Sequence, residues 1–142
     1  MSSKKKLFTF GRERELENAS CFIGNESKAN PLVELIDVIH DYLDNKVDID
    51  YVKEFVEVAI VEGYSGVWES STTWLNRLGQ VDSSILDLWT KLAKHNSAKV
   101  RFRVACNLDT ISPLVASEVA NLLLNDRSKK VREMAEERRS GS

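Results

Sequence analysis

The second half of the chain repeats itself with an offset of 31 residues. Paired positions carry the same kind of side chain: Leu88 and Val119, Leu92 and Leu123, Ser97 and Ser128, Lys99 and Lys130, Val100-Arg101 and Val131-Arg132, and Val104 and Ala135. A period of this length is typical of stacked helical hairpins, because a single hairpin cannot bury its own apolar face. The repeat therefore predicts that residues 84–138 form two similar pairs of helices.

Helical spacing of apolar residues extends over the rest of the chain, while the alternating pattern of strands is almost absent. The predicted helices cover residues 12–22, 31–43, 48–62, 67–78, 85–93, 98–108, 113–124 and 131–138. Gly63 and Gly79 are expected to end helices, and Ser84 with Asp87 is expected to form a capping box. The predicted fold class is all-α, a short α-solenoid of about three stacked helical hairpins.

One string in the repeat has a recognisable pattern: Asp126-Arg127-Ser128-Lys129-Lys130-Val131-Arg132. It resembles the HEAT/armadillo-like repeat family, whose hairpins often end the first helix with Asp and begin the second with Val-Arg. The resemblance covers residues 84–138 and implies a structural ladder in which Asp126 meets the arginines Arg101 and Arg132. In the preceding repeat His95 stands where the Asp would be, which departs from the family pattern.

The position of Arg101 on its predicted helix supports such a ladder. At about 100° per residue, Arg101 lies within the apolar arc of Val100, Val104 and Leu108, while Lys99 and Arg103 lie on the other side. An arginine on an apolar arc requires an acidic or carbonyl partner. Asp126 is the candidate partner. The alternative is that Arg101 extends its charged end to solvent from the edge of the stripe.

Length and composition favour one domain that needs no disulfide or metal. A chain of 142 residues with 42% hydrophobic side chains buries roughly 68–70% of its unfolded surface. We expect a flexible basic tail at 1–6, a single helical domain over 7–139 and a flexible end at 140–142. No stretch approaches the ~18–20 apolar residues of a membrane span, and the start lacks the apolar core of a secretion signal. A cytoplasmic protein without membrane contact is expected.

The residues that carry catalysis are scarce. The chain has two histidines, His40 and His95, and two cysteines, so the common zinc spacings are absent. His40 is expected on a helix surface. No phosphate-binding loop or dinucleotide fingerprint occurs. We expect no catalytic residue, no metal, no cofactor and no small-molecule substrate, and therefore not an enzyme.

Charge is segregated along the chain. Residues 26–69 contain eleven acidic and three basic side chains, a net of −8, whereas residues 77–139 contain eight acidic and twelve basic ones, a net of +4. The acidic residues fall on one face of each of two successive helices: Glu34, Asp37, Asp41 and Asp44 on the first, and Asp50, Glu54 and Glu57 on the second. Tyr51 and Trp68 lie near them and are of the types that anchor interfaces. The plainer interpretation is a solvated face, but it leaves the single sign of the charges unexplained.

A small HEAT-like chain with a one-sided acidic face resembles bacterial immunity proteins, which are paired with nuclease toxins in contact-dependent growth inhibition and related systems. The resemblance implies a basic protein partner, a toxin nuclease domain whose cleft the acidic face covers. Reversing Asp37, Asp41 and Glu54 to Lys is then expected to abolish binding without loss of helix. One alternative is nucleic-acid binding through the basic half, at Lys94, Lys99, Arg103, Lys129 and Lys130, which the pI near 5.8 disfavours. The other is a scaffold or adaptor.

Overall fold

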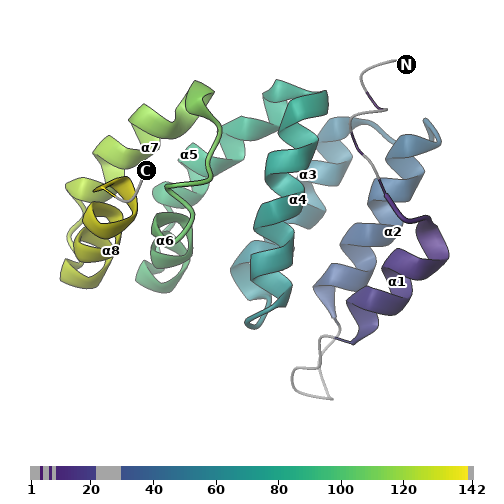
Figure 1. The fold of residues 1–142 in the computed structure, drawn as a ribbon, viewed down its shortest axis with the longest axis horizontal. Coiled ribbons are helices and arrows are strands. Elements are labelled where there is room, and N and C mark those ends of the chain that lie inside the picture. Colours follow the sequence, from purple (N-terminus) through teal and green to yellow (C-terminus); the bar gives the residue numbers. More distant parts are fainter. Residues whose placement is uncertain (1–3, 5–6, 8, 22–29, 141–142) are drawn as a thin grey trace. The chain divides into compact units, whose positions relative to one another are not determined.

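The computed structural model describes residues 4, 7, 9–21 and 30–140, which form helices and no strand (Figure 1). The helices are α1 (Arg12–Ser20), α2 (Pro31–Leu43), α3 (Ile49–Glu62), α4 (Val67–Val81), the short 3-10 helix η2 (Ser83–Leu86), α5 (Asp87–Ala93), α6 (Ala98–Ala105), α7 (Pro113–Leu124) and α8 (Lys129–Ser140). None of these described helices is long and apolar enough to cross a membrane. The predicted all-α, helical-repeat-like fold is confirmed.

The chain divides into two compact units, Met1–Ile85 and Leu86–Ser142. The single domain expected over 7–139 stays a prediction. Within the first unit, Lys4 of the expected flexible tail contacts α2: its ammonium donates hydrogen bonds of 2.6 Å to the Tyr42 carbonyl and to Asn45 Oδ1. The other residues of this tail, 1–3, 5 and 6, lie outside the described residues. Leu7, which directly follows the tail, is buried.

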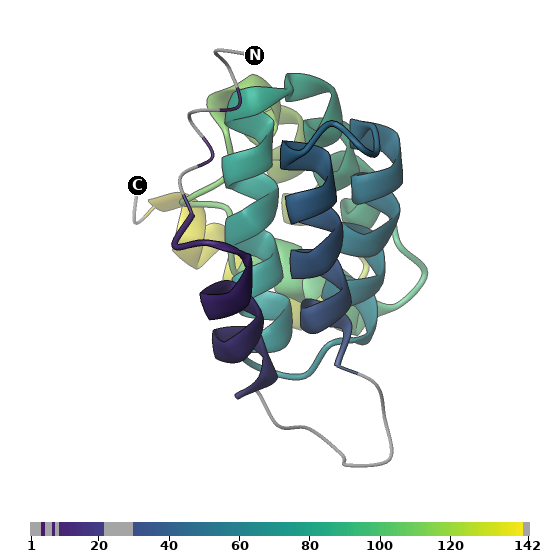
Figure 2. The ribbon, with the colours of Figure 1, turned by 90° about the vertical axis from the view of Figure 1, so that its right-hand side faces the viewer.

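Helix α2 is central to the first unit, because it contacts α1, α3 and α4 (Figure 2). Its start follows the sequence signal: the Asn30 side chain accepts a 3.0 Å hydrogen bond from Leu32 N, and Pro31 occupies the first turn. Leu35, Ile36 and Ile39 are then completely or almost completely buried. The amphipathic pattern of residues 31–43 was therefore sufficient to place this helix in the core.

Helix α4 is longer than the sequence predicts, since it continues through Gly79 to Val81. Burial of Leu75 and Leu78 outweighs the cost of about 1 kcal/mol for glycine inside a helix. The hydroxyl groups of Ser71 and Thr72 donate hydrogen bonds of 2.7 Å to the carbonyls of Val67 and Glu69, respectively. These bonds allow both side chains to be buried in a helix.

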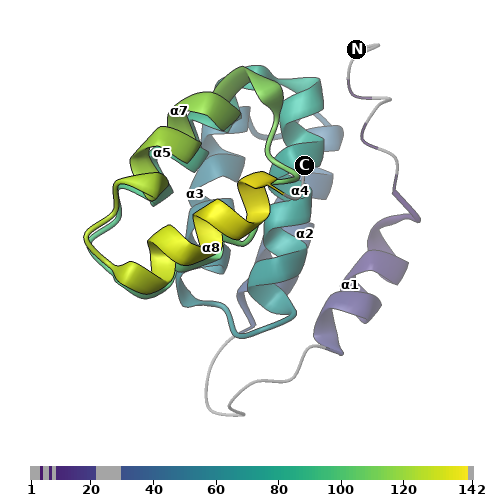
Figure 3. The ribbon, with the colours of Figure 1, turned by 60° about the vertical axis from the view of Figure 1, so that its left-hand side comes forward.

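The second unit is a stack of two hairpins, α5 with α6 and α7 with α8. Helix α5 also contacts α7, and α6 contacts α8, so equivalent helices of the two repeats lie side by side (Figure 1). Figure 3 shows the second repeat, α7 and α8, from its outer side. Trp89, Leu88 and Leu92 of the first repeat and Val119 and Leu123 of the second are fully buried. The 31-residue offset thus corresponds to the step from one hairpin to the next.

Two predicted helix ends in this region are wrong. The expected capping box does not form, because the Asp82 carboxylate accepts both the amide (3.0 Å) and the hydroxyl (2.6 Å) of Ser84. Residues Ser83–Leu86 consequently form η2, and α5 begins at Asp87. Helix α6 ends at Ala105 and not at residue 108. The Asn107 side chain donates a 2.8 Å hydrogen bond to the Arg103 carbonyl and so competes with the backbone bonds of a further helical turn.

Candidate functional site

The acidic row of α2 is partly neutralised by α1. The Arg12 guanidinium donates from Nη2 to Asp37 Oδ1 at 2.5 Å and to Asp41 Oδ1 at 3.0 Å. Its hydrogen bonds to Asp37 first, and then to Asp41, raise the pKa of Arg12. Glu34 and Asp44, at the two ends of the row, are exposed and lie outside the ion pairs that Arg12 forms with Asp37 and Asp41. The predicted continuous acidic face is therefore interrupted at its centre by Arg12. No sequence signal indicated this contact.

Helix α3 presents an acidic face that also contains apolar side chains. Asp50 and Glu54 are exposed as predicted, and Glu57 is half-buried with an interaction inside the chain. Between them Tyr51 is 45% exposed, and its ring lies 5.2 Å from that of Phe55, centroid to centroid, at a tilt of 54°. Val58, one turn further on, is 43% exposed.

We call Tyr51, Phe55 and Val58 the α3 strip, because spacings of four and three residues place them on one side of the helix. The core of α3 is a different stripe, formed by Val52, Val56, Ala59 and Ile60. The helical spacing of residues 48–62 predicts Phe55 in this core stripe, together with Val52, Val56 and Ala59, and leaves Val58 outside it. The sequence signal for the α3 strip is a second apolar period, Tyr51, Phe55 and Val58, which runs beside the core period. On α3 the core stripe is buried, whereas Tyr51 and Val58 of the α3 strip are exposed.

The aromatic residues near α3 have different environments. Trp68, predicted to contact a partner, is half-buried in the first turn of α4 and interacts within the chain. Tyr64, in the connection between α3 and α4, is 40% exposed. Trp74 is buried, with the Arg77 guanidinium 4.1 Å from its ring centroid. Tyr64 is thus exposed to solvent, as Tyr51 of the α3 strip is, whereas Trp68 is half-buried and Trp74 is buried.

The ladder expected in the second unit is present. Arg101 Nε donates to Asp126 Oδ2 at 2.7 Å, and its Nη1 donates to the carbonyls of His95 (2.8 Å) and Asn96 (3.0 Å). In the next repeat Arg132 Nη1 donates to the Asp126 carbonyl at 2.7 Å, the counterpart of the bond from Arg101 to His95. His95 and Asp126 also accept equivalent hydrogen bonds in their turns. Ser97 N donates to His95 Nδ1, and Ser128 N donates to Asp126 Oδ1. The imidazole of His95 thus occupies the place of the missing carboxylate.

The basic cluster loses one of its predicted members. Arg103 is buried and interacts within the chain, whereas its helical spacing predicts a position on the solvent side of α6. The reason is that α6 contacts α5, α7 and α8, so that more than one side of this short helix is covered. Burial lowers the pKa of Arg103. Lys94, Lys99, Lys129 and Lys130 are exposed.

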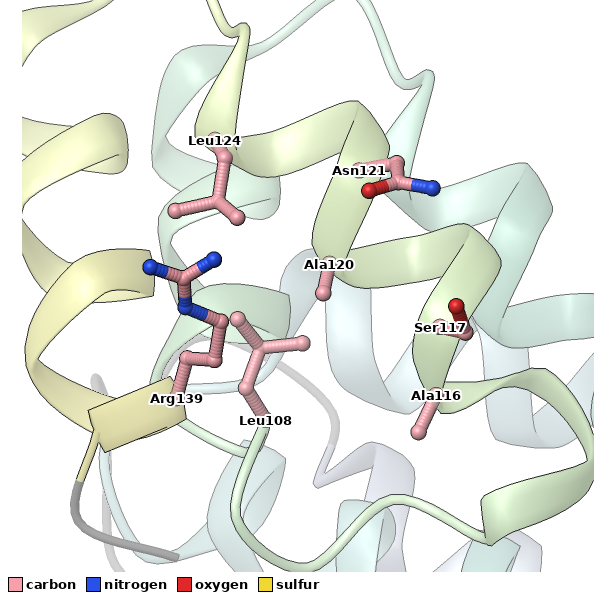
Figure 4. A pocket seen from close by; sticks show the side chains of 7 residues that line it. All are labelled: Leu108, Ala116, Ser117, Ala120, Asn121, Leu124 and Arg139. Atoms are coloured by element: carbon pink, nitrogen blue, oxygen red, sulfur yellow. The ribbon is translucent and has the colours of Figure 1, made fainter.

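A cavity of about 320 Å³ opens in the second unit between α7, the end of α8 and the connection after α6 (Figure 4). Its lining residues are Leu108, Ala116, Ser117, Ala120, Asn121, Leu124 and Arg139. Arg139 also forms a 2.8 Å ion pair with Glu136. No base is among the lining residues to activate the Ser117 hydroxyl, so this lining offers no nucleophile with its base. In the described part of the chain no three metal-ligating side chains come together.

His40 is buried, contrary to the surface position expected from the sequence. It is 7% exposed, and its Nε2 atom has no hydrogen-bond partner among the described residues. Burial, and then the nearby charge of Arg12, lower the pKa of His40, against the opposing carboxylates of Glu15, Asp44 and Asp37. The packing of α1, α3 and α4 around α2 leaves little of that helix exposed, which its own periodicity does not reveal.

We predict that His40 destabilises the fold in acid. Its pKa in the unfolded chain is near 6.5, and in the folded chain it is lower, so the unfolded state binds the proton first. The free energy of unfolding should fall as the pH drops below about 6.5. Urea unfolding of the wild type and His40→Leu at pH 7.5 and 5.5 measures this. Between pH 7.5 and pH 5.5 the free energy of unfolding should fall more for the wild type than for His40→Leu. An equal fall in the two proteins would contradict the prediction.

The chain matches no protein-family model, no curated protein and no solved structure. The arrangement of the helices establishes an all-α fold with stacked hairpins in the second unit. The likeness to HEAT/armadillo-like repeats remains a resemblance of residues 84–138.

Proposed function

We propose that this protein is a non-enzymatic protein-binding module, an immunity protein that neutralises a nuclease toxin by covering the basic cleft of the toxin domain. The observation that carries the proposal is the α3 strip with its flanking acids. Tyr51 and Val58 expose apolar surface on a helix face that also carries Asp50 and Glu54. Acidic residues beside exposed aromatic ones favour a basic partner, because charge accelerates encounter and the aromatic rings slow release.

The position of Arg12 changes which acids are assigned to the partner. Since Asp37 and Asp41 already bind Arg12, a basic partner would have to displace this arginine before it could use them. Asp50 and Glu54 need no such exchange. The proposed contact is therefore centred on α3, with Glu34 and Asp44 of α2 as its outer acids. Reversal of Asp37 and Asp41 is no longer a clean test, because it would also release α1.

Two other functions are compatible with a helical chain of this size. Nucleic-acid binding through the second unit is weakened by the burial of Arg103 and by the ion pair of Lys129 with Glu133 at 3.7 Å. Phosphate contacts need several free cations along one surface. A scaffold or adaptor would use the same α3 strip with a partner that is not a toxin. Isolation of stable partners from the native host distinguishes an adaptor from an inhibitor.

We predict that Tyr51→Ala weakens toxin binding by at least about 2 kcal/mol, roughly 30-fold, since truncating an anchoring aromatic residue has this effect. Glu54→Lys should slow association and remove part of its salt dependence. The partner to test is the product of the neighbouring toxin gene, by calorimetry and by growth on co-expression. Glu118→Lys, an exposed reversal on α7, is the matched control and should bind as wild type does.

Both α3 variants should keep the helical circular dichroism, because the side chains are exposed. Cells that die from the toxin whether or not this protein is present would refute the immunity function. Neutralisation that survives the combined Tyr51→Ala, Val58→Ala and Glu54→Lys variant would instead refute the assignment of the surface to α3.

A further inference from the structure

A second cavity lies at the start of α6 and α8 in the second unit. Its volume is about 260 Å³, and its lining comes from the first turns of the two equivalent helices: Ala98, Lys99 and Phe102 of α6, with Lys130 and Val131 of α8 and the preceding Ser128. The helices contact each other along the stack. The floor of the cavity is apolar, because it is made of the methyl groups of Ala98 and Val131 and the half-buried ring of Phe102.

The rim of this cavity is cationic. Lys99 and Lys130 occupy the same position of successive repeats and are both exposed, and neither ammonium group has an acidic partner among the described residues. Their neighbour Lys129 differs, because it pairs with Glu133. The start of α6 has no side-chain cap, so the positive end of that helix adds to the two charges.

We infer that this Lys99–Lys130 groove binds an acidic peptide segment of a partner protein. One apolar side chain of the peptide fills the cavity between Phe102 and Val131, and carboxylates on either side of it bind the two lysines. Charge complementarity requires an anionic ligand, and the apolar floor requires one with a hydrocarbon side chain beside the charge. The groove lies in the second unit and carries no residue of the α3 strip, so it is independent of the function proposed above.

A peptide fits this groove better than a nucleic acid does. Two unpaired cations flank a single apolar cavity, whereas a phosphate backbone needs a longer row of free basic side chains. Three neighbouring basic side chains are engaged within the chain instead, because Arg103 is buried, Arg132 is bonded to the Asp126 carbonyl and Lys129 is paired with Glu133.

The test is an NMR titration of the full-length protein with the peptide acetyl-Glu-Glu-Leu-Phe-Glu-Glu-amide, up to millimolar concentration. The amide signals of Ala98, Lys99, Lys130 and Val131 should shift and saturate. The same peptide with Gln in place of every Glu should bind at least about tenfold more weakly, because it lacks the charge-assisted bonds. Lys99→Glu with Lys130→Glu should cause a similar loss. Lys94→Glu, an exposed reversal just before the turn, is the control and should change affinity by less than about twofold.

Three outcomes would overturn the inference. A short single-stranded DNA that shifts the same amides at a lower concentration than the peptide would assign the groove to nucleic acid. Shifts that appear when the protein alone is concentrated would assign it to a second copy of this chain. Peptide titration without shifts at these amides would show that the groove does not bind acidic segments. Phe102→Ala adds an independent check, since loss of the floor should weaken binding while circular dichroism stays unchanged.

Discussion

Replacement of Asp126 by alanine is expected to lower the free energy of unfolding by about 3–5 kcal/mol, because it leaves a buried charge without its partner. Arg101 and Asp126 are only 5% and 8% exposed. The guanidinium cannot turn toward water, since its Nη1 is held by the carbonyls of His95 and Asn96. Truncating the carboxylate also leaves the Ser128 amide without its acceptor. Urea unfolding followed by circular dichroism measures the loss.

Glu133→Ala is the matched control, because it removes an acid from an exposed ion pair in the same repeat. Its effect should stay within about 0.5 kcal/mol. The double variant Arg101→Met with Asp126→Leu should recover most of the loss, since two apolar side chains avoid the desolvation of two charges. Equal stabilities of Asp126→Ala and Glu133→Ala would show that the ladder does not hold the hairpins together.

The ionisation of Asp126 gives the same pair a pH dependence. Burial by itself would raise the pKa of this carboxyl, but the hydrogen bonds from Arg101 and from the Ser128 amide outweigh it, so the pKa lies below the ordinary value of 3.8. The stabilising contribution is therefore complete above that value and is lost as the pH falls through the lower pKa of the folded protein. This loss occurs at lower pH than the one predicted for His40, so acid titration separates the two groups.

The ladder was predictable because two signals in the sequence agree on it. The 31-residue repeat aligns Arg101 with Arg132, and the apolar arc around Arg101 demands an acidic partner. The ion pair between Arg12 and Asp37 had no comparable signal. Helix α1 buries only Ala19 and lies outside the repeat, so neither periodicity nor self-similarity indicates which surface it covers. Contacts that follow a repeat can be read from one sequence, whereas contacts of a polar, non-repeated helix cannot.

The candidate binding surface was predictable in its charge but not in its shape. Asp50 and Glu54 are exposed on α3, as their spacing indicates. Its spacing predicts Phe55 in the core, because an apolar residue at helical spacing is normally buried. With apolar residues on two sides of α3, the sequence does not say which stripe faces the core. Neighbouring helices decide this, and they leave Tyr51 and Val58 open to solvent.

Gly63→Ala is expected to destabilise the fold by about 1–3 kcal/mol through overpacking. Gly63 ends α3, as its position after the last helical turn predicts, but its φ of −70° is open to any residue. The requirement is spatial instead. A Cβ atom at this position would lie closer than 3.0 Å to both the Ala59 carbonyl oxygen and Val67 Cγ1. That same carbonyl accepts a 3.0 Å hydrogen bond from the Gly63 amide, so relief of the clash breaks the last bond of α3.

Ser65→Ala, an exposed change in the same connection, is the control and should shift the urea midpoint very little. Adding Val67→Ala to Gly63→Ala should cost less than the two single changes together, since it removes one of the two clashing groups. The Ala59 carbonyl stays in place, so recovery should be incomplete. If Gly63→Ala is as stable as Ser65→Ala, α3 and α4 do not approach this closely in solution. The close approach fixes where α3 ends, and through it the orientation in which α3 presents Tyr51 and Val58.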